Sequence, residues 1–216
     1  MRLAMCFSAA ALLAFSAGCG TVAGGRALPV SATPSSAAAA AIRGPSSLEF
    51  RKVVANATRA GVAGAGSPPS PNARQSRDEP EQLAALRAID CTPGTTDPLA
   101  GHDDRARPLV TCGRGENVAY LLEPEFLPGS EVAEATSGYD EQRGQWLVNL
   151  KFKSEGTKTW ADFTSKNINQ QVAFVVDSQV LSAPNIQIAI LDGVTTISGK
   201  FTEQSARELA DRIAGR

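Results

Sequence analysis

Apolar and polar side chains alternate most regularly over residues 145–153. The apolar positions are Trp146, Val148, Leu150 and Phe152. The residues between them are mostly polar, and successive side chains of a β-strand point to opposite faces. This segment is therefore predicted to be a strand with one face in the core and the other in water.

Five shorter segments are also patterned like strands: residues 48–54, 118–122, 172–176, 179–181 and 194–201. The third of them is a continuous apolar run, which is typical of a central strand covered on both faces. The dipeptides Asp177-Ser178 and Asp192-Gly193 precede the last two segments and are predicted to be tight turns. Most of the sheet is therefore expected to come from the second half of the chain.

Three segments carry apolar side chains at helical spacing. In residues 81–89 they are Leu83, Leu86 and Ile89. A second helix is predicted where Ser154 stands as a cap, with Glu155 in its first turn. The last helix is predicted to follow a Thr202 cap, and its apolar stripe is Ala206, Leu209, Ala210, Ile213 and Ala214. This order of elements predicts an α+β fold, a mixed β-sheet with helices packed on one face.

The N-terminus has the pattern of a secretion signal. Arg2 supplies a positive charge, and the apolar run at residues 5–17 is shorter than the roughly 20 residues of a membrane span. The run ends in small residues before Cys19, which resembles the lipobox of bacterial lipoproteins, although Ser16 stands where leucine is usual. We therefore expect a signal peptide at residues 1–18 and a lipid on Cys19. An ordinary secretory signal is the alternative.

Two stretches have the composition of loose chain. Residues 19–47 are mainly Ala, Ser, Gly and Pro, and we expect them to form a flexible tether after the lipidated cysteine. Residues 55–82 contain a second such stretch and are predicted to be a low-complexity linker. The α+β domain is expected to occupy residues 83–216, a length that can bury a workable core.

Overall charge and cysteine content narrow the classes of function. The net charge is −1, from 21 basic and 22 acidic residues, so nothing indicates a nucleic-acid-binding surface. Cys91 and Cys112 remain after the leader and Cys19, and in an oxidising compartment they are expected to form a disulfide. It would stabilise the fold by about 3 kcal/mol in the chain-entropy model. A metal site that enlists His102 is the alternative, but two cysteines and one histidine are an incomplete zinc set.

No constellation of residues indicates catalysis. An enzyme needs a nucleophile with a base, paired carboxylates in a cleft, or a metal. His102 and the neighbouring Asp103-Asp104 lie in a polar stretch and are interpreted as a solvated, charged loop. Gly61, Gly64 and Gly66 do not follow a strand, as a phosphate-binding loop would. We therefore expect no catalytic residues, no metal and no cofactor.

Several sequence motifs stand in a characteristic order. They are Tyr120-Leu121-Leu122-Glu123-Pro124, Ser182-Ala183-Pro184-Asn185 and Ile197-Ser198-Gly199-Lys200-Phe201-Thr202. This order resembles the first extracytoplasmic domain of SecD, a membrane subunit that assists Sec-dependent protein export. The resemblance implies that residues 48–54 form the strand that opens the base of that domain. It also implies that residues 83–216 form its head, in a SecD-like α+β fold.

The sequence departs from the SecD pattern at three places. Glu123 stands where glycine is usual, and Asp177-Ser178 stands where SecD proteins have Asp-Gly. A side chain at a positive-φ turn position costs about 1 kcal/mol, so we expect this turn to be of another type. The chain also ends at Arg216, where SecD would continue into its membrane bundle. We therefore expect a lipoprotein without the SecD membrane helices, which cannot itself couple proton flow to export.

The resemblance implies a non-catalytic lipoprotein on the extracytoplasmic face of the bacterial plasma membrane. It would be accessory to Sec-dependent export and would bind Sec translocase subunits or unfolded exported polypeptides. Ser182, Ala183, Pro184 and Asn185 are the candidate binding surface, because Pro184 interrupts strand pairing and should leave backbone groups free. The alternative is that this run only ends a strand. The alternative function is an envelope module that binds a small ligand, a wall component or another envelope protein.

Overall fold

The computed structural model describes residues 47–58 and 68–216. The predicted signal peptide, nearly all of the tether and the lipid-attachment residue Cys19 lie outside the described residues. Within the described part, no helix is both long and apolar enough to cross a membrane.

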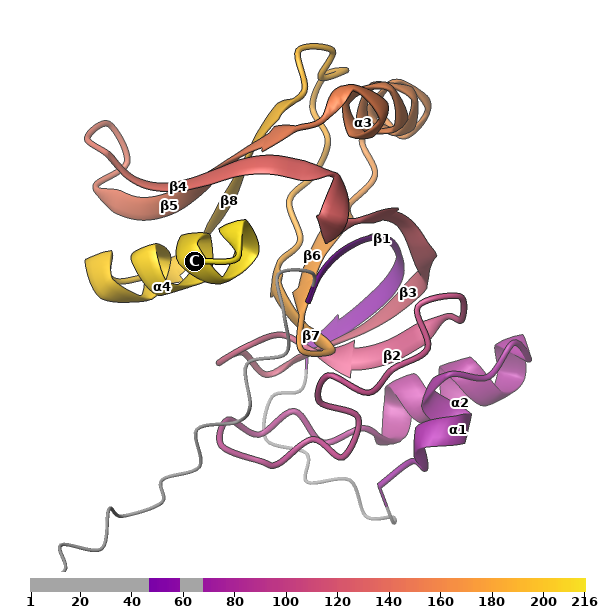
Figure 1. The fold of residues 1–216 in the computed structure, drawn as a ribbon. Helices are drawn as coiled ribbons and strands as arrows, with labels where there is room; N and C mark the ends of the chain where they lie inside the picture. Colours follow the sequence, from indigo (N-terminus) through magenta and orange to yellow (C-terminus); the bar gives the residue numbers. More distant parts are fainter. Residues whose placement is uncertain (1–46, 59–67) are drawn as a thin grey trace, which may run out of the picture. The chain divides into compact units, whose positions relative to one another are not determined.

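Five strands form the first sheet, in the order β2-β3-β1-β6-β7 (Figure 1). They are β1 (Leu48–Thr58), β2 (Leu109–Cys112), β3 (Val118–Pro128), β6 (Val172–Val176) and β7 (Gln179–Ser182). All neighbours in this order pair antiparallel. The sheet curls so that its first and last strands approach each other. Gly113 and Val180 form a parallel bridge, and the amide of Arg114 donates to the Val180 carbonyl at 2.8 Å.

Three strands form the second sheet, in the order β4-β5-β8. They are β4 (Val132–Asp140), β5 (Gln145–Phe152) and β8 (Val194–Phe201), and a 3-10 turn, η1 (Gly129–Glu131), leads into β4. Helix α4 (Glu203–Ala214) packs on this sheet, and α3 (Ser154–Lys166) contacts β3 and β5. Helices α1 (Pro71–Arg74) and α2 (Glu79–Ala88) pack near β2 and β3 of the first sheet (Figure 1).

The predicted α+β class is confirmed, and the arrangement is more elaborate than a single sheet. The strands divide between two sheets. Among the described residues, all pairs of named strands are antiparallel, and the parallel contact is the bridge between Gly113 and Val180. The helices also serve both sheets and do not share one face, because each sheet has an apolar surface of its own to cover.

The main core lies between the two sheets and is rich in aromatic side chains. The ring of Phe50 makes edge-to-face contacts with Phe152, Trp160 and Phe174 at centroid distances of 5.2, 5.5 and 5.4 Å. Strand β6 is buried along its whole length, with alternate side chains in two different cores. It is therefore the central, doubly covered strand that its continuous apolar run predicts.

Regular structure also occurs where the composition predicts a linker. Strand β1 continues to Thr58 because its second half pairs with β3, for example Ala55 with Leu121. Short helices begin at Pro71 and Glu79, each preceded by a capping residue whose side chain accepts an amide hydrogen bond. A distant strand and two local caps thus order parts of residues 55–82 that lack a strong apolar pattern.

The start of α3 differs from the prediction. Ser154 is the first helical residue and does not cap it, and Lys153 at the cap position makes no side-chain cap bond. The Glu131 carboxylate, from the 3-10 turn, instead accepts a hydrogen bond from the amide of Gly156 at 3.1 Å. The cap therefore comes from a residue far away in the sequence, which satisfies one of the free amides of the first turn.

The last helix agrees closely with the prediction. Thr202 caps it, in a reciprocal arrangement with Ser205. Ala206, Leu209, Ala210 and Ile213 are buried. Ala214, the remaining member of the predicted stripe, is exposed because the helix ends there and the chain turns at Gly215 with a positive φ of 71°.

Candidate functional site

An apolar cleft of about 400 Å³ opens beside the start of β8. Its walls come from α3, β6, the segment that joins β7 to β8, and β8 itself. They include Trp160, Phe174, Pro184, Ile186, Ile188 and Thr196. The volume lies within the range of ligand-binding clefts, and Asp192 is the charged side chain on its walls.

The segment between β7 and β8 is held at defined points. Ile186 exchanges main-chain hydrogen bonds with the α3–β6 connection, donating to Gln170 and accepting from Asn169, each at 2.8 Å. Further along, the amide of Ile190 donates to the Thr164 hydroxyl of α3 at 3.0 Å. These anchors fix both ends of a short arm whose middle points away from the core.

The arm presents apolar side chains to water. Ile188 is 71% exposed and Leu191 is 68% exposed, and Val194 at the start of β8 is also exposed. Isolated exposed apolar residues are ordinary, but Ile188 and Val194 also line the apolar cleft, and the exposed Leu191 lies between two of its lining residues, Ile190 and Asp192, in the sequence. This arrangement is the one we take as the candidate binding site.

The predicted segment Ser182, Ala183, Pro184 and Asn185 lies next to this cleft, and the last two residues line it. The expectation that Pro184 leaves neighbouring backbone groups free is wrong. The Ala183 carbonyl accepts from the side-chain amide of Gln171 at 3.0 Å, and the Pro184 carbonyl accepts from the Val172 amide at 3.1 Å. Proline removes only a donor, so neighbouring carbonyls still pair. Pairing resumes at Asn185, which bridges Gln171.

Two buried polar atoms near the cleft have no hydrogen-bond partner among the described residues. They are the Trp160 indole nitrogen and the Ser182 hydroxyl. Trp160 is almost wholly buried and its ring forms part of the cleft wall. A buried indole N–H usually finds an acceptor, so this one marks a place where a bound group could satisfy it.

A buried charge cluster lies in the first sheet, centred on Arg51. The Arg51 side chain is 0% exposed and contacts Glu49 at 2.6 Å and Asp103 at 2.8 Å. It also donates to the main-chain carbonyls of Arg107 and Glu123. Each nitrogen of the guanidinium therefore has a hydrogen-bond partner, as a buried charge requires.

The cluster corrects two expectations from the sequence. Asp103 does not belong to a solvated loop, because its side chain is 3% exposed and pairs with Arg51. The turn at Asp177-Ser178 keeps positive φ at both residues, 52° and 62°, instead of changing type. The buried Ser178 hydroxyl lies 2.7 Å from the Leu99 carbonyl and 2.5 Å from an Asp103 carboxylate oxygen. These bonds offset the strain of the turn, and only the tertiary structure could indicate them.

Carboxylates outnumber guanidiniums in this cluster. Glu49 also lies 3.5 Å from Arg105, which in turn lies 3.8 Å from Glu125. Burial raises the pKa of Glu49 from 4.5 to about 7, with the neighbouring Asp103 charge adding to the rise and Arg51 opposing it. Burial also raises the pKa of Glu125. One carboxyl of this group therefore keeps its proton well above the ordinary range.

Glu49 makes the stability depend on pH. Between pH 4.5 and about 7 the folded chain retains the Glu49 proton that the unfolded chain has lost. The free energy of unfolding is therefore expected to decrease as the pH rises through this window. Denaturant unfolding at several pH values measures this slope, and Glu49→Gln should flatten it. The control Glu134→Gln alters an exposed carboxylate and should leave the slope unchanged. A contribution of the opposite sign would contradict this assignment.

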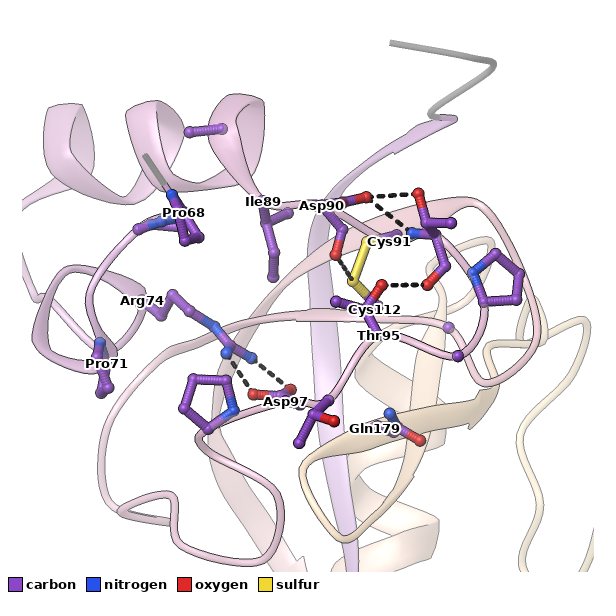
Figure 2. A pocket seen from close by; sticks show the side chains of 18 of the residues that line it. Pro68, Pro71, Arg74, Ile89, Asp90, Cys91, Thr95, Asp97, Cys112 and Gln179 are labelled. Carbon is purple, nitrogen blue, oxygen red and sulfur yellow. Dashed lines mark hydrogen bonds and ion pairs between the residues drawn. A yellow bond between two sulfur atoms is a disulfide. The ribbon is translucent and has the colours of Figure 1, made fainter. Parts of the chain in front are cut away.

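A second pocket, of about 460 Å³, lies beside the disulfide (Figure 2). Cys91 and Cys112 are joined there, with a Cα–Cα distance of 5.4 Å. Opposite them, the Arg74 guanidinium makes a bidentate ion pair with Asp97 at 2.5 and 2.9 Å. Arg74 also donates to the Val110 carbonyl at 2.8 Å, so it stabilises this wall of the pocket.

His102 lies exposed in the turn after Leu99, to whose carbonyl its amide donates at 2.8 Å. It lines neither of the two pockets described above. Among residues 47–58 and 68–216, no three His, Cys, Asp or Glu side chains are grouped so as to hold a metal ion.

Comparison with known proteins connects this fold to one family. The model of the SecDF P1 head subdomain matches residues 107–215. The protein translocase subunit SecD of Mycobacterium tuberculosis is 44% identical over 141 residues, which are 64% of this chain and 25% of that protein. SecD of Streptomyces coelicolor is 34% identical over 139 residues, 59% of this chain and 24% of that protein.

Solved structures of SecDF are also similar to this chain. The crystal structure of SecDF in its super-membrane-facing form is 26% identical, with a TM-score of 0.45, and the match covers 78% of this chain and 18% of that one. The chain spans about a quarter of the length of the curated relatives it matches. The family model nevertheless covers half of the chain, including the strands and helices that enclose the cleft. The chain belongs to the SecDF P1 head subdomain family.

Proposed function

We propose that this protein is a non-catalytic accessory component of Sec-dependent protein export that binds unfolded segments of exported polypeptides. Membership of the SecDF P1 head family supports a role linked to protein translocation. The observation that carries the proposal is the apolar cleft beside β8, with Ile188 and Val194 exposed on its walls. Unfolded chains carry the exposed apolar side chains that such a surface binds.

The chemistry of the cleft suits many different sequences. Its walls are mainly apolar, and they offer no pair of opposite charges that would select one partner. Contacts of this kind depend on apolar area and little on the identity of each side chain. A protein that receives exported chains of many sequences needs this tolerance. We propose Sec translocase subunits as a second class of partner, because membership of the SecDF family supports a role in protein translocation.

We further propose that the protein is held on the extracytoplasmic face of the plasma membrane by lipid on Cys19. The signal-like residues 1–18 support this location, as does the disulfide between Cys91 and Cys112, because disulfides persist in oxidising compartments. Each buried methylene of a lipid chain contributes about 0.8 kcal/mol, so two chains hold a protein stably. The mass of the chain extracted from membranes tests this anchor.

Ile188→Asp is expected to weaken the binding of an unfolded secretory polypeptide by about tenfold, because it places a charge at the apolar rim. Fluorescence anisotropy with a labelled, reduced and unfolded secretory protein measures the dissociation constant. Tyr139→Asp is the matched control, because Tyr139 is also an exposed large side chain but lies at the far end of the second sheet. Equal binding by the two variants, or no binding by the native chain, would remove the proposal.

The pocket beside the disulfide favours a second candidate function, an envelope module that binds a small ligand. Its enclosure by the segment around Cys91 and Asp97 suits a small molecule better than an extended chain (Figure 2). Crosslinking in native membranes followed by purification separates the two functions. Recovery of exported polypeptides or Sec subunits favours the first, and recovery of wall enzymes or a retained small molecule favours the second.

A further inference from the structure

The exposed edge of β8 has a regular hydrogen-bonding pattern. The amide of Phe152 donates to the Gly193 carbonyl at 2.9 Å, and Leu150 and Val148 lie opposite Thr195 and Ile197. In an antiparallel pair, hydrogen-bonded positions alternate with positions whose main-chain groups point the other way. The main-chain groups of residues 194, 196 and 198 therefore point away from β5, towards the open edge.

This edge has no strand beside it. Strand β8 is the last in the order β4-β5-β8, and within the described residues no main-chain hydrogen bond from another element reaches Thr196 or Ser198. The Val194 amide donates only to the Asp192 side chain, at 3.1 Å. Near Gly199 the strand approaches Leu181 of β7, so the open stretch covers residues 194–198, roughly 17 Å of strand.

The open stretch at residues 194–198 lacks the features that usually block strand pairing, because the register irregularity of β8 lies beyond Ser198. Natural edge strands are protected by charged side chains, proline, bulges or a covering helix. Residues 194–199 contain neither charge nor proline, and all four of residues 194–197 are β-branched. The opposite edge strand, β4, carries Glu134 and packs against α4.

The cleft lies directly along this edge. Val194 and Thr196 line it together with Trp160 and Phe174 of the core. The buried Thr195, which points to the core, also lines the cleft, so a strand laid along β8 would direct alternate side chains into it. The buried Trp160 indole N–H, which has no partner in the described part of the chain, lies in that wall.

We infer that an unfolded polypeptide binds here in extended form, as a fourth strand paired with the open edge of β8. This inference rests on the proposed function and adds how the polypeptide is held. Main-chain hydrogen bonds to residues 194, 196 and 198 provide affinity that does not depend on sequence, and the cleft takes alternate apolar side chains. The occupant is therefore an uncharged, β-prone segment, and one proline or a block of charges in it would prevent binding.

Thr196→Pro tests this mode of binding. Proline at this position removes the amide that points to the open edge and leaves the main-chain pairing with β5 in place, and it also removes the Thr196 hydroxyl that donates to Asn149. The probe is a fluorescein-labelled peptide of about ten residues, alternating valine and threonine between terminal lysines, long enough to cover the open stretch. We expect about tenfold weaker binding to the full chain carrying Thr196→Pro. Thr196→Val removes the same hydroxyl but keeps the amide, so the peptide should bind it several times more tightly than it binds Thr196→Pro, and equal binding by the two variants would contradict strand addition.

A second probe keeps the test decisive if Thr196→Pro disturbs folding, which circular dichroism reports. The same peptide with N-methyl groups on its central amides cannot pair as a strand and should bind the native chain at least tenfold more weakly. If both peptides bind equally and Ile188→Asp still weakens them, strand addition is wrong and the proposed function stands. If neither peptide nor unfolded protein binds, both fail. If Thr196→Pro instead abolishes self-association without changing peptide binding, the edge joins two copies of this chain.

Discussion

Replacing Arg51 with methionine is expected to lower the free energy of unfolding by about 3–5 kcal/mol. The guanidinium is 0% exposed and is the direct partner of Glu49 and Asp103, at 2.6 and 2.8 Å. Methionine fills much of the same volume but leaves Asp103 without its Arg51 partner, Glu49 with the more distant Arg105, and two main-chain carbonyls without this donor. Denaturant unfolding of the full chain measures the difference.

A matched variant separates this effect from the general loss of a charge. Arg105→Met removes a guanidinium of the same cluster that is 38% exposed, and it should cost less than about 1 kcal/mol. Adding Glu49→Gln and Asp103→Asn to Arg51→Met should restore part of the lost stability, because the uncompensated carboxylates are then gone. If Arg51→Met and Arg105→Met were equally mild, the cluster would not be a buried, coupled unit.

Removal of the disulfide is expected to have the second-largest effect, a loss of about 3 kcal/mol for the double substitution of Cys91 and Cys112 by serine. The two cysteines are 21 residues apart and tie the segment after α2 to the end of β2. Without this link the unfolded chain gains the freedom of that loop. Thermal and denaturant unfolding, with and without reductant, measure the loss.

The native chain under reducing conditions provides the control. Its stability should fall to that of the double variant, and reductant should have no effect on the variant itself. Peptide binding at the cleft should persist in both, because the cleft lies beside β8 and the disulfide lies beside β2. A large loss of peptide binding on reduction would show that the two regions are coupled.

Both effects concern the first sheet, which supplies part of the cleft wall through β6. Strand β6 connects the two parts, since Val172 and Phe174 face the main core and line the cleft, whereas Ala173 and Val175 face the core beneath β2. Phe50 on β1 packs against Phe174 and Trp160. The part of the cleft wall that β6 forms is therefore packed on both faces, which keeps it rigid.

Local pattern was sufficient for the regular elements and for the family. The alternation at residues 145–153, the apolar run of β6 and the Thr202 cap each report how one segment meets the core, and each is confirmed. The motifs in order along the chain likewise indicated the SecD family, which the family model confirms. Periodicity shows which side chains of a regular element are buried, and the neighbouring residues in the sequence are enough to reveal it.

The tertiary structure alone decided which groups meet. The carbonyls of Ala183 and Pro184 find donors in Gln171 and Val172, so the predicted free segment is paired. Asp103 pairs with Arg51, which is 52 residues away in the sequence. The cleft and the open edge of β8 likewise exist only because two sheets meet there without closing. The partners of polar groups and the gaps between elements depend on long-range packing, which no local pattern encodes.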